Sequence, residues 1–170
     1  MLNRSISLRL PVLFLVALAG LLVVCGTARA QRPDAELRGI TTVGVLVEPL
    51  GQPAATCGFS REMLEQALAR ALTGGGLKVV PHKDEDTYVD LRVETLNVQA
   101  GVCVSRFDTT VFTTTTARLS YQSQPVAVRV SLLHAAGLSG GGVTGHAASV
   151  LHSIQQKVEE FASRIRAASQ

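Results

Sequence analysis

Aromatic side chains are scarce in this sequence, which has no tryptophan, two tyrosines and five phenylalanines among its 170 residues. Proteins that bind sugars or nucleic-acid bases by stacking need a platform of such rings. The sequence offers none, and its hydrophobic core has to be built from valine, leucine, isoleucine and alanine. It therefore argues against a binder of sugars or bases that works by stacking.

Complete nucleotide and nucleophile motifs are also missing. Gly140–Gly145 matches the GxGxxG pattern of dinucleotide sites, but such a site needs a further strand with an acidic residue, which the pattern does not show here. Gly58–Ser60 supplies only half of a GxSxG motif, and Ser60 is a good candidate for a helix cap. We therefore predict no catalytic residue and no cofactor, and we interpret residues 137–145 as a flexible, glycine-rich loop.

The histidines show no spacing that would join two metal ligands on one element. HxH, HxxxH and HExxH are all absent. We predict no metal site, and we expect surface or capping roles for the four histidines. These are His82, His134, His146 and His152.

The first 30 residues have the pattern of a cleaved export signal. Arg4 and Arg9 precede an apolar run over Leu10–Cys25, and Ala28 and Ala30 form the small-x-small site that a signal peptidase cuts. We therefore expect the mature protein to begin at residue 31 and to be periplasmic or secreted.

Two alternatives leave the protein attached to a membrane. An uncleaved anchor would need about 20 apolar residues, and this run is shorter. Lipidation at Cys25 usually requires a small residue before the cysteine, and Val24 stands there. Both alternatives are less favoured than cleavage.

The excess of basic over acidic side chains is lost when the export signal is removed. The net charge of +3 includes Arg4, Arg9 and Arg29, so the rest of the chain carries 13 basic and 13 acidic side chains. A neutral chain without a basic cluster has no electrostatic drive toward nucleic acid or an anionic membrane. We expect neither nucleic acid nor a stable membrane anchor as a partner, and the sequence leaves the oligomeric state open.

The remaining pattern predicts one α+β domain over residues 40–170, after a flexible lead-in over 31–39. We expect about five strands in one mostly antiparallel sheet, with two helices packed on the same face. The second helix should dock through its apolar stripe. The expected strands are 41–48, 77–80, 88–98 with a β-bulge at Thr95 or Leu96, 102–121 with a break within 113–116, and 126–132. The first expected helix starts at Ser60 and ends at Gly74–Gly76. The second starts after residue 145 and carries the apolar stripe Leu151, Ile154, Val158, Phe161 and Ile165.

Threonines dominate residues 109–116, which have high β-propensity and little apolar content. An exposed strand face is the usual reason for this composition. A sheet edge offered to another chain is the alternative.

Cys57 and Cys103 are the only cysteines left after processing, and an oxidising compartment favours a disulfide between them. Such a bond would tie the start of the first helix to a central strand. The alternative, a reactive Cys57 at the helix N-terminus, lacks a second nearby cysteine to complete a redox cycle.

Four segments resemble a family of small exported bacterial proteins that has no assigned activity. The resemblance is carried by Cys57–Ser60, Gly76–Val80, Tyr88–Val98 and Gly101–Val104. The order of elements is also similar to the TolB N-terminal domain and to LptE-type lipoproteins, which bind other envelope components. The resemblance implies compartment, disulfide and fold, and it carries over no site residue.

These observations favour a non-catalytic accessory or binding protein of the bacterial cell envelope. A small periplasmic enzyme is the first alternative, and it would need at least two of the histidines and a carboxylate in one pocket. An assembly subunit that pairs through an edge strand is the second.

Overall fold

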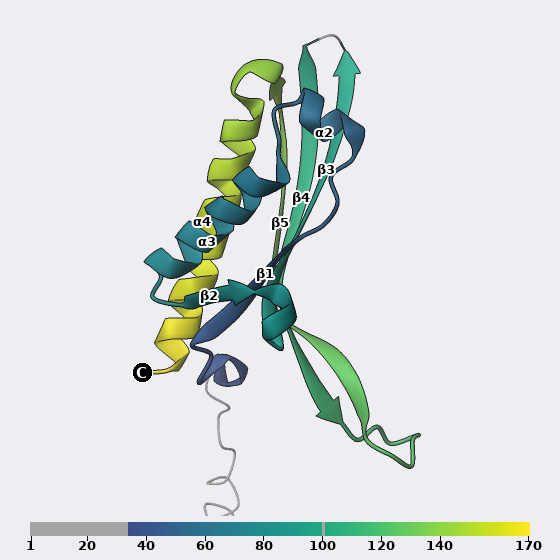
Figure 1. Ribbon diagram of the computed structural model, residues 1–170, viewed down its shortest axis with the longest axis vertical. Coiled ribbons are helices and arrows are strands. Elements are labelled where there is room, and N and C mark those ends of the chain that lie inside the picture. Colours follow the sequence, from purple (N-terminus) through teal and green to yellow (C-terminus); the bar gives the residue numbers. More distant parts are fainter. Residues whose placement is uncertain (1–33, 100) are drawn as a thin grey trace, which may run out of the picture. The chain divides into compact units, whose positions relative to one another are not determined.

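The computed structural model describes residues 34–99 and 101–170, which form a five-stranded sheet with helices and confirm the α+β class (Figure 1). The predictions for residues 1–33, including Cys25 and the cleavage site at Ala28 and Ala30, lie outside these residues. The elements are β1 (Thr42–Val47), α2 (Gln52–Thr56), α3 (Arg61–Gly74), β2 (Lys78–Pro81), β3 (Thr87–Gln99), β4 (Val102–Ala117), β5 (Val126–Gly142) and α4 (Val143–Ala168).

The strands lie in the order β2-β1-β3-β4-β5. β1 pairs in parallel with both β2 and β3, whereas β3 with β4 and β4 with β5 form much longer antiparallel ladders. The sheet is thus mixed, and its antiparallel part carries most of the pairing. β2 and β5 are the two edges.

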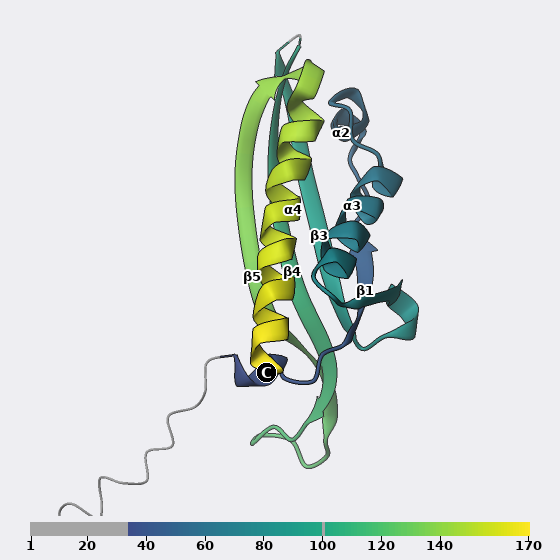
Figure 2. The same cartoon turned by 90° about the vertical axis from the view of Figure 1, so that its left-hand side faces the viewer.

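Both long helices cover the same face of the sheet, as expected (Figure 2). α3 begins where Ser60 accepts a hydrogen bond from the Met63 backbone N–H at 3.2 Å, which is the predicted cap. On α4 the apolar stripe faces the sheet, with Ile154, Val158 and Ile165 fully buried. None of the described helices is long and apolar enough to cross a membrane.

Cys57 and Cys103 are joined by a disulfide, with their Cα atoms 6.1 Å apart. Cys57 follows α2, a short helix that sequence reasoning missed, and Cys103 lies at the start of β4. Both cysteines are fully buried. The bond therefore ties the segment leading into α3 to an interior strand of the sheet, close to the β3–β4 turn.

The described part of the expected lead-in, residues 34–39, is docked rather than flexible. Leu37 sits in a 3₁₀ turn and is completely buried. Arg164 on α4 donates to the Asp34 carboxylate at 3.0 Å, and this hydrogen bond lowers the pKa of Asp34. The Gly39 backbone N–H donates to Ser169 Oγ. The polar composition concealed one apolar residue that reaches the core.

β3 and β5 are longer than expected, whereas β4 ends at Ala117 and not at residue 121. The β4–β5 ladder has one irregularity, between Val111 and Phe112. The β3–β4 irregularity falls between Asn97 and Gln99, not at Thr95 or Leu96, and β4 runs without a break through residues 113–116. Leu96 does not return to the core, and it is 64% exposed on the opposite face. β4 is an interior strand as far as Thr113, where its pairing with β3 ends, so the first part of the threonine-rich segment is not a sheet edge. From Thr114 to Thr116 the strand pairs only with β5.

The prediction of a glycine-rich loop over 137–145 is wrong, because β5 continues as far as Gly142. A Cβ on Gly137 would lie 2.5 Å from Cζ of Phe107, its partner across the ladder. The glycine therefore makes room for a buried ring within the sheet. Gly145, with φ +86°, turns the chain into the regular part of α4.

One end of the β4–β5 ladder projects beyond the helices, at the lower right of Figure 1. We call residues 113–130 the arm. None of its residues is buried, in contrast to the alternating burial of β4 from Cys103 to Val111. The arm is held by its ladder and not by a core.

Candidate functional site: the open face of the sheet

The face of the sheet opposite the helices carries charged side chains on three adjacent strands. On β3, alternation buries Val89, Leu91 and Val93 and turns the residues between them to this face. The register then sets Arg92 opposite Asp108 and Glu94 opposite Arg106. We call this surface the open face; its acidic, basic and histidine residues are Glu48, Asp90, Arg92, Glu94, Arg106, Asp108, Arg129 and His134.

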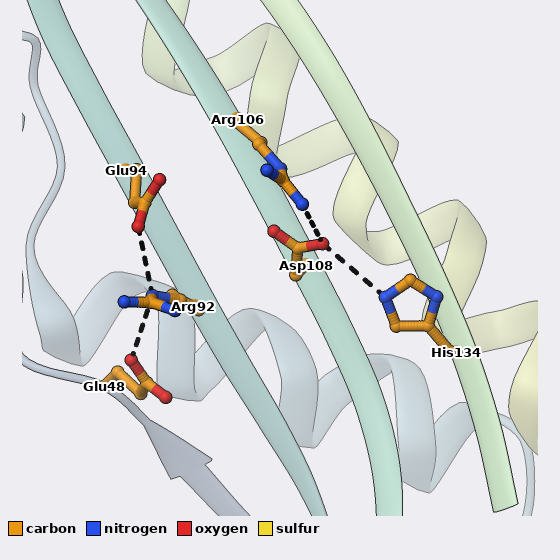
Figure 3. A network of polar contacts seen from close by, with 6 residues as sticks. All are labelled: Glu48, Arg92, Glu94, Arg106, Asp108 and His134. Carbon is orange, nitrogen blue, oxygen red and sulfur yellow. Dashed lines mark hydrogen bonds and ion pairs between the residues drawn. The ribbon is translucent and has the colours of Figure 1, made fainter. Parts of the chain in front are cut away.

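Six of these side chains form two groups of ion pairs (Figure 3). Arg92 Nε lies 3.4 Å from the Glu48 carboxylate and 3.2 Å from that of Glu94. Asp108 Oδ1 accepts a hydrogen bond from Arg106 at 3.0 Å and lies 3.5 Å from His134 Nε2. The hydrogen bond from Arg106 to Asp108 raises the pKa of Arg106.

These pairs contribute little to folding. The Arg92, Glu94 and Arg106 side chains are each more than half exposed, and exposed pairs of this kind are typically worth about 0–1 kcal/mol. Water and salt screen them, so their partners can be exchanged at small cost. The open face is thus a set of charges of both signs that another surface can engage.

A small cavity of about 160 Å³ lies on the same face. Arg129 bounds it, lying 4.4 Å above the Phe112 ring and donating to the Tyr88 hydroxyl at 3.3 Å. The hydrogen bond to Tyr88 raises the pKa of Arg129. The remaining lining residues are Glu48, Asp90, Arg92, Asp108 and Thr110.

Asp90 has the least favourable surroundings of these carboxylates. Its Oδ1 is buried and has no hydrogen-bond partner in the described part of the chain. Burial raises the pKa of Asp90, and the negative charge of Glu48 raises it further, against smaller opposing effects of Arg129, His82 and Arg92. Asp90 therefore holds its proton more tightly than an ordinary aspartate does.

Apolar side chains are exposed at the end of the open face near the β3–β4 turn. Leu138 on β5 is 75% exposed, and Leu96 on β3 lies in the row next to it in the register. Exposed apolar side chains beside charges are typical of surfaces that bind other proteins. Sequence reasoning missed this patch because it assigned Leu96 to the core.

The four histidines lie in different surroundings. His134 is on the open face, His82 packs edge-on against Tyr88 with ring centroids 4.4 Å apart, and His152 is exposed on α4. His146 is only 3% exposed, so the expectation of a surface or capping role is wrong for this residue. The cavity described above is lined by none of them.

His146 belongs to a buried polar cluster between α4 and the sheet. Its Nε2 lies 2.8 Å from Ser105 Oγ, and Ser105 Oγ lies 2.9 Å from Thr95 Oγ1. A serine–histidine pair can form a nucleophile, but it needs access for a substrate and a group that orients the other ring nitrogen. Ser105 is completely buried, and Nδ1 of His146 has no partner within residues 34–99 and 101–170. The cluster links α4 to the sheet.

Sequence reasoning missed this cluster because no short motif joins Thr95, Ser105 and His146. Ser105 does show one signal, its place in the inward-facing alternation between Cys103 and Phe107. A polar residue at such a position needs a polar partner.

Within the described residues, no group of three or more His, Cys, Asp or Glu side chains is arranged to hold a metal ion. No family model matches the chain. The search of curated proteins also finds no match.

Proposed function

We propose that this protein is a non-catalytic accessory or binding protein of the bacterial cell envelope, periplasmic after cleavage at Ala30. It engages another envelope protein through the open face. The observation that carries the proposal is a sheet face that the described helices leave uncovered and that presents exposed charges of both signs beside exposed apolar side chains.

Three further features support it. The disulfide between Cys57 and Cys103 suits an oxidising compartment. The mature chain has no net charge, which favours a protein partner over nucleic acid. The serine and histidine that could act as a catalytic pair are enclosed in the core, where they support the fold.

Affinity capture from the native envelope, read by mass spectrometry, tests the proposal. Three baits are compared, namely the wild type, the open-face variant Arg92→Glu with Arg106→Glu, and a control, Arg70→Glu. Arg70 is exposed on α3, so the control reverses a charge on the helical side of the sheet.

A specific partner should be captured by the wild type and the control and lost from the open-face variant. A partner captured equally by all three baits would refute the open face as the binding surface. N-terminal sequencing of the exported protein tests the compartment, because a start at Gln31 supports cleavage and a lipid-bearing start at Cys25 would make the protein a membrane-anchored lipoprotein.

A further inference from the structure

The two edges of the sheet differ in their protection against another strand. Edge strands in natural proteins are kept from pairing by shortness, by lysine and by proline. β2 has four residues and contains both Lys78 and Pro81. β5 has seventeen residues, and none of them is lysine, proline, aspartate or glutamate. Charged side chains and β-bulges also protect edges, and β5 has Arg129 and a bulge at Leu132. From Ala135 to Gly142 it has none of these protections.

The side chains of β5 also leave its edge open to close approach. From Ala135 to Gly142 they are alanine, glycine and serine, apart from Leu138. Within the described residues β5 pairs only with β4, and Figure 2 shows its other side without a neighbouring element. Its outward backbone groups can thus hydrogen-bond with another strand.

We propose that β5 pairs antiparallel with β5 of a second copy of this chain, so that one sheet runs through both copies. Such a contact is isologous, because each copy offers the same strand to the other. The contact uses the edge of the sheet and leaves the charged part of the open face free, so it does not depend on the proposed function.

The position of α4 favours a second copy over an isolated peptide strand. α4 packs on both β4 and β5, over the seam between them (Figure 2). Strands in a sheet lie about 4.8 Å apart, so a two-fold axis beside β5 would place the two α4 axes about 10 Å apart. Helices in direct contact pack at about 8–10 Å. The two α4 helices would therefore touch when the β5 strands pair.

The charges on α4 suit this contact. Glu159 and Arg166 line a cavity together with Arg70 of α3, so this side of α4 faces α3. At about 100° per residue, Lys157 and Glu160 lie on the flank away from α3. Within one copy they are paired at 3.2 Å. A two-fold axis makes the helices antiparallel, so Lys157 of one copy can face Glu160 of the other.

The test uses the full chain in its disulfide-bonded form. Its mass is measured by light scattering and sedimentation from about 1 to 100 µM, a range that detects weak dimers. The protection of β5 amides from hydrogen exchange is measured over the same range. The variant is Ala136→Lys with Leu138→Lys, on the exposed face of β5, and the matched control is Thr114→Lys with Thr116→Lys, on exposed positions of β4.

The expected wild-type mass is twice that of the chain, with β5 amides that become protected as the concentration rises. The β5 variant should have the mass of one chain and an unchanged melting temperature, whereas the control should remain dimeric. A wild type that is monomeric at 100 µM, or a β5 variant that stays dimeric, would overturn the proposal. So would a monomer whose β5 amides are protected at every concentration, or an assembly that grows without limit.

Discussion

Replacing Gly137 by alanine tests whether the glycine run is part of the sheet. The added methyl group would lie 2.5 Å from Cζ of Phe107, and the Phe107 ring is only 2% exposed and has little space to move. Overpacking of this kind costs about 1–3 kcal/mol. Replacing a glycine within a strand by alanine stabilises the folded state by about 0.5–1 kcal/mol. The net expectation is a loss of about 1–2 kcal/mol in the free energy of unfolding.

Gly140→Ala is the matched control on the same strand. Its new Cβ would lie 3.6 Å from Cγ2 of Val104, an ordinary contact, so only the backbone gain remains. Thermal and urea unfolding should show Gly137→Ala melting about 3–10 °C below the wild type, and Gly140→Ala at or slightly above it.

A double-mutant cycle with Phe107→Leu assigns the loss to the ring. Phe107→Leu should cost less in the Gly137→Ala background than in the wild type, because the smaller side chain relieves the overlap. If Gly137→Ala is as stable as the wild type, or if the two changes are simply additive, the close packing of Phe107 on Gly137 is wrong.

Phe161→Ala on α4 should lose about 3–5 kcal/mol, because the ring is 2% exposed; an unchanged melting temperature, equal to that of the exposed control Ser163→Ala, would contradict the docking of α4. Mass analysis should show the processed protein two hydrogens short, with Cys57 and Cys103 alkylated only after reduction, and loss of the bond should cost up to about 4 kcal/mol. Alkylation of both thiols without reductant would refute this tether. Asp90→Asn should change the pH dependence of stability. The pKa of Asp90 is raised in the folded state, so the folded state binds this proton more tightly than the unfolded state does. The wild type therefore loses stability as the pH rises above 3.8, and the variant lacks this loss. Unfolding between pH 4 and 7 should show the variant gaining on the wild type by about 1 kcal/mol or less, since the carboxylate is partly screened, and a constant difference would contradict the assignment.

Local sequence patterns correctly predicted the elements that have one face buried and one face in water. The alternation of Val89, Leu91 and Val93 gave β3, and the Ser60 cap with the glycines after α3 gave both ends of that helix. In these cases burial repeats regularly along the element, so the spacing of apolar residues in the sequence is enough to predict it.

Predictions failed where a distant residue decides the outcome. The sequence around Gly137 predicts a loop, because it does not show that Phe107 lies across from this glycine. It likewise predicts a surface position for His146, because it does not show the contact with Ser105. Only part of the open face could be predicted from the sequence. Its charges on β3 follow from alternation, but the placement of Asp108 and His134 on the neighbouring strands, where they lie 3.5 Å apart, depends on a register that no local pattern specifies.

The arm gives the β4–β5 ladder two regions of unequal stability. Near Phe107 the ladder is fixed by the core, whereas residues 113–130 contribute no buried side chain. Local opening requires little free energy where few apolar contacts are lost. The same two strands therefore combine a longer part that the core holds rigid with a shorter end that can bend without unfolding the domain.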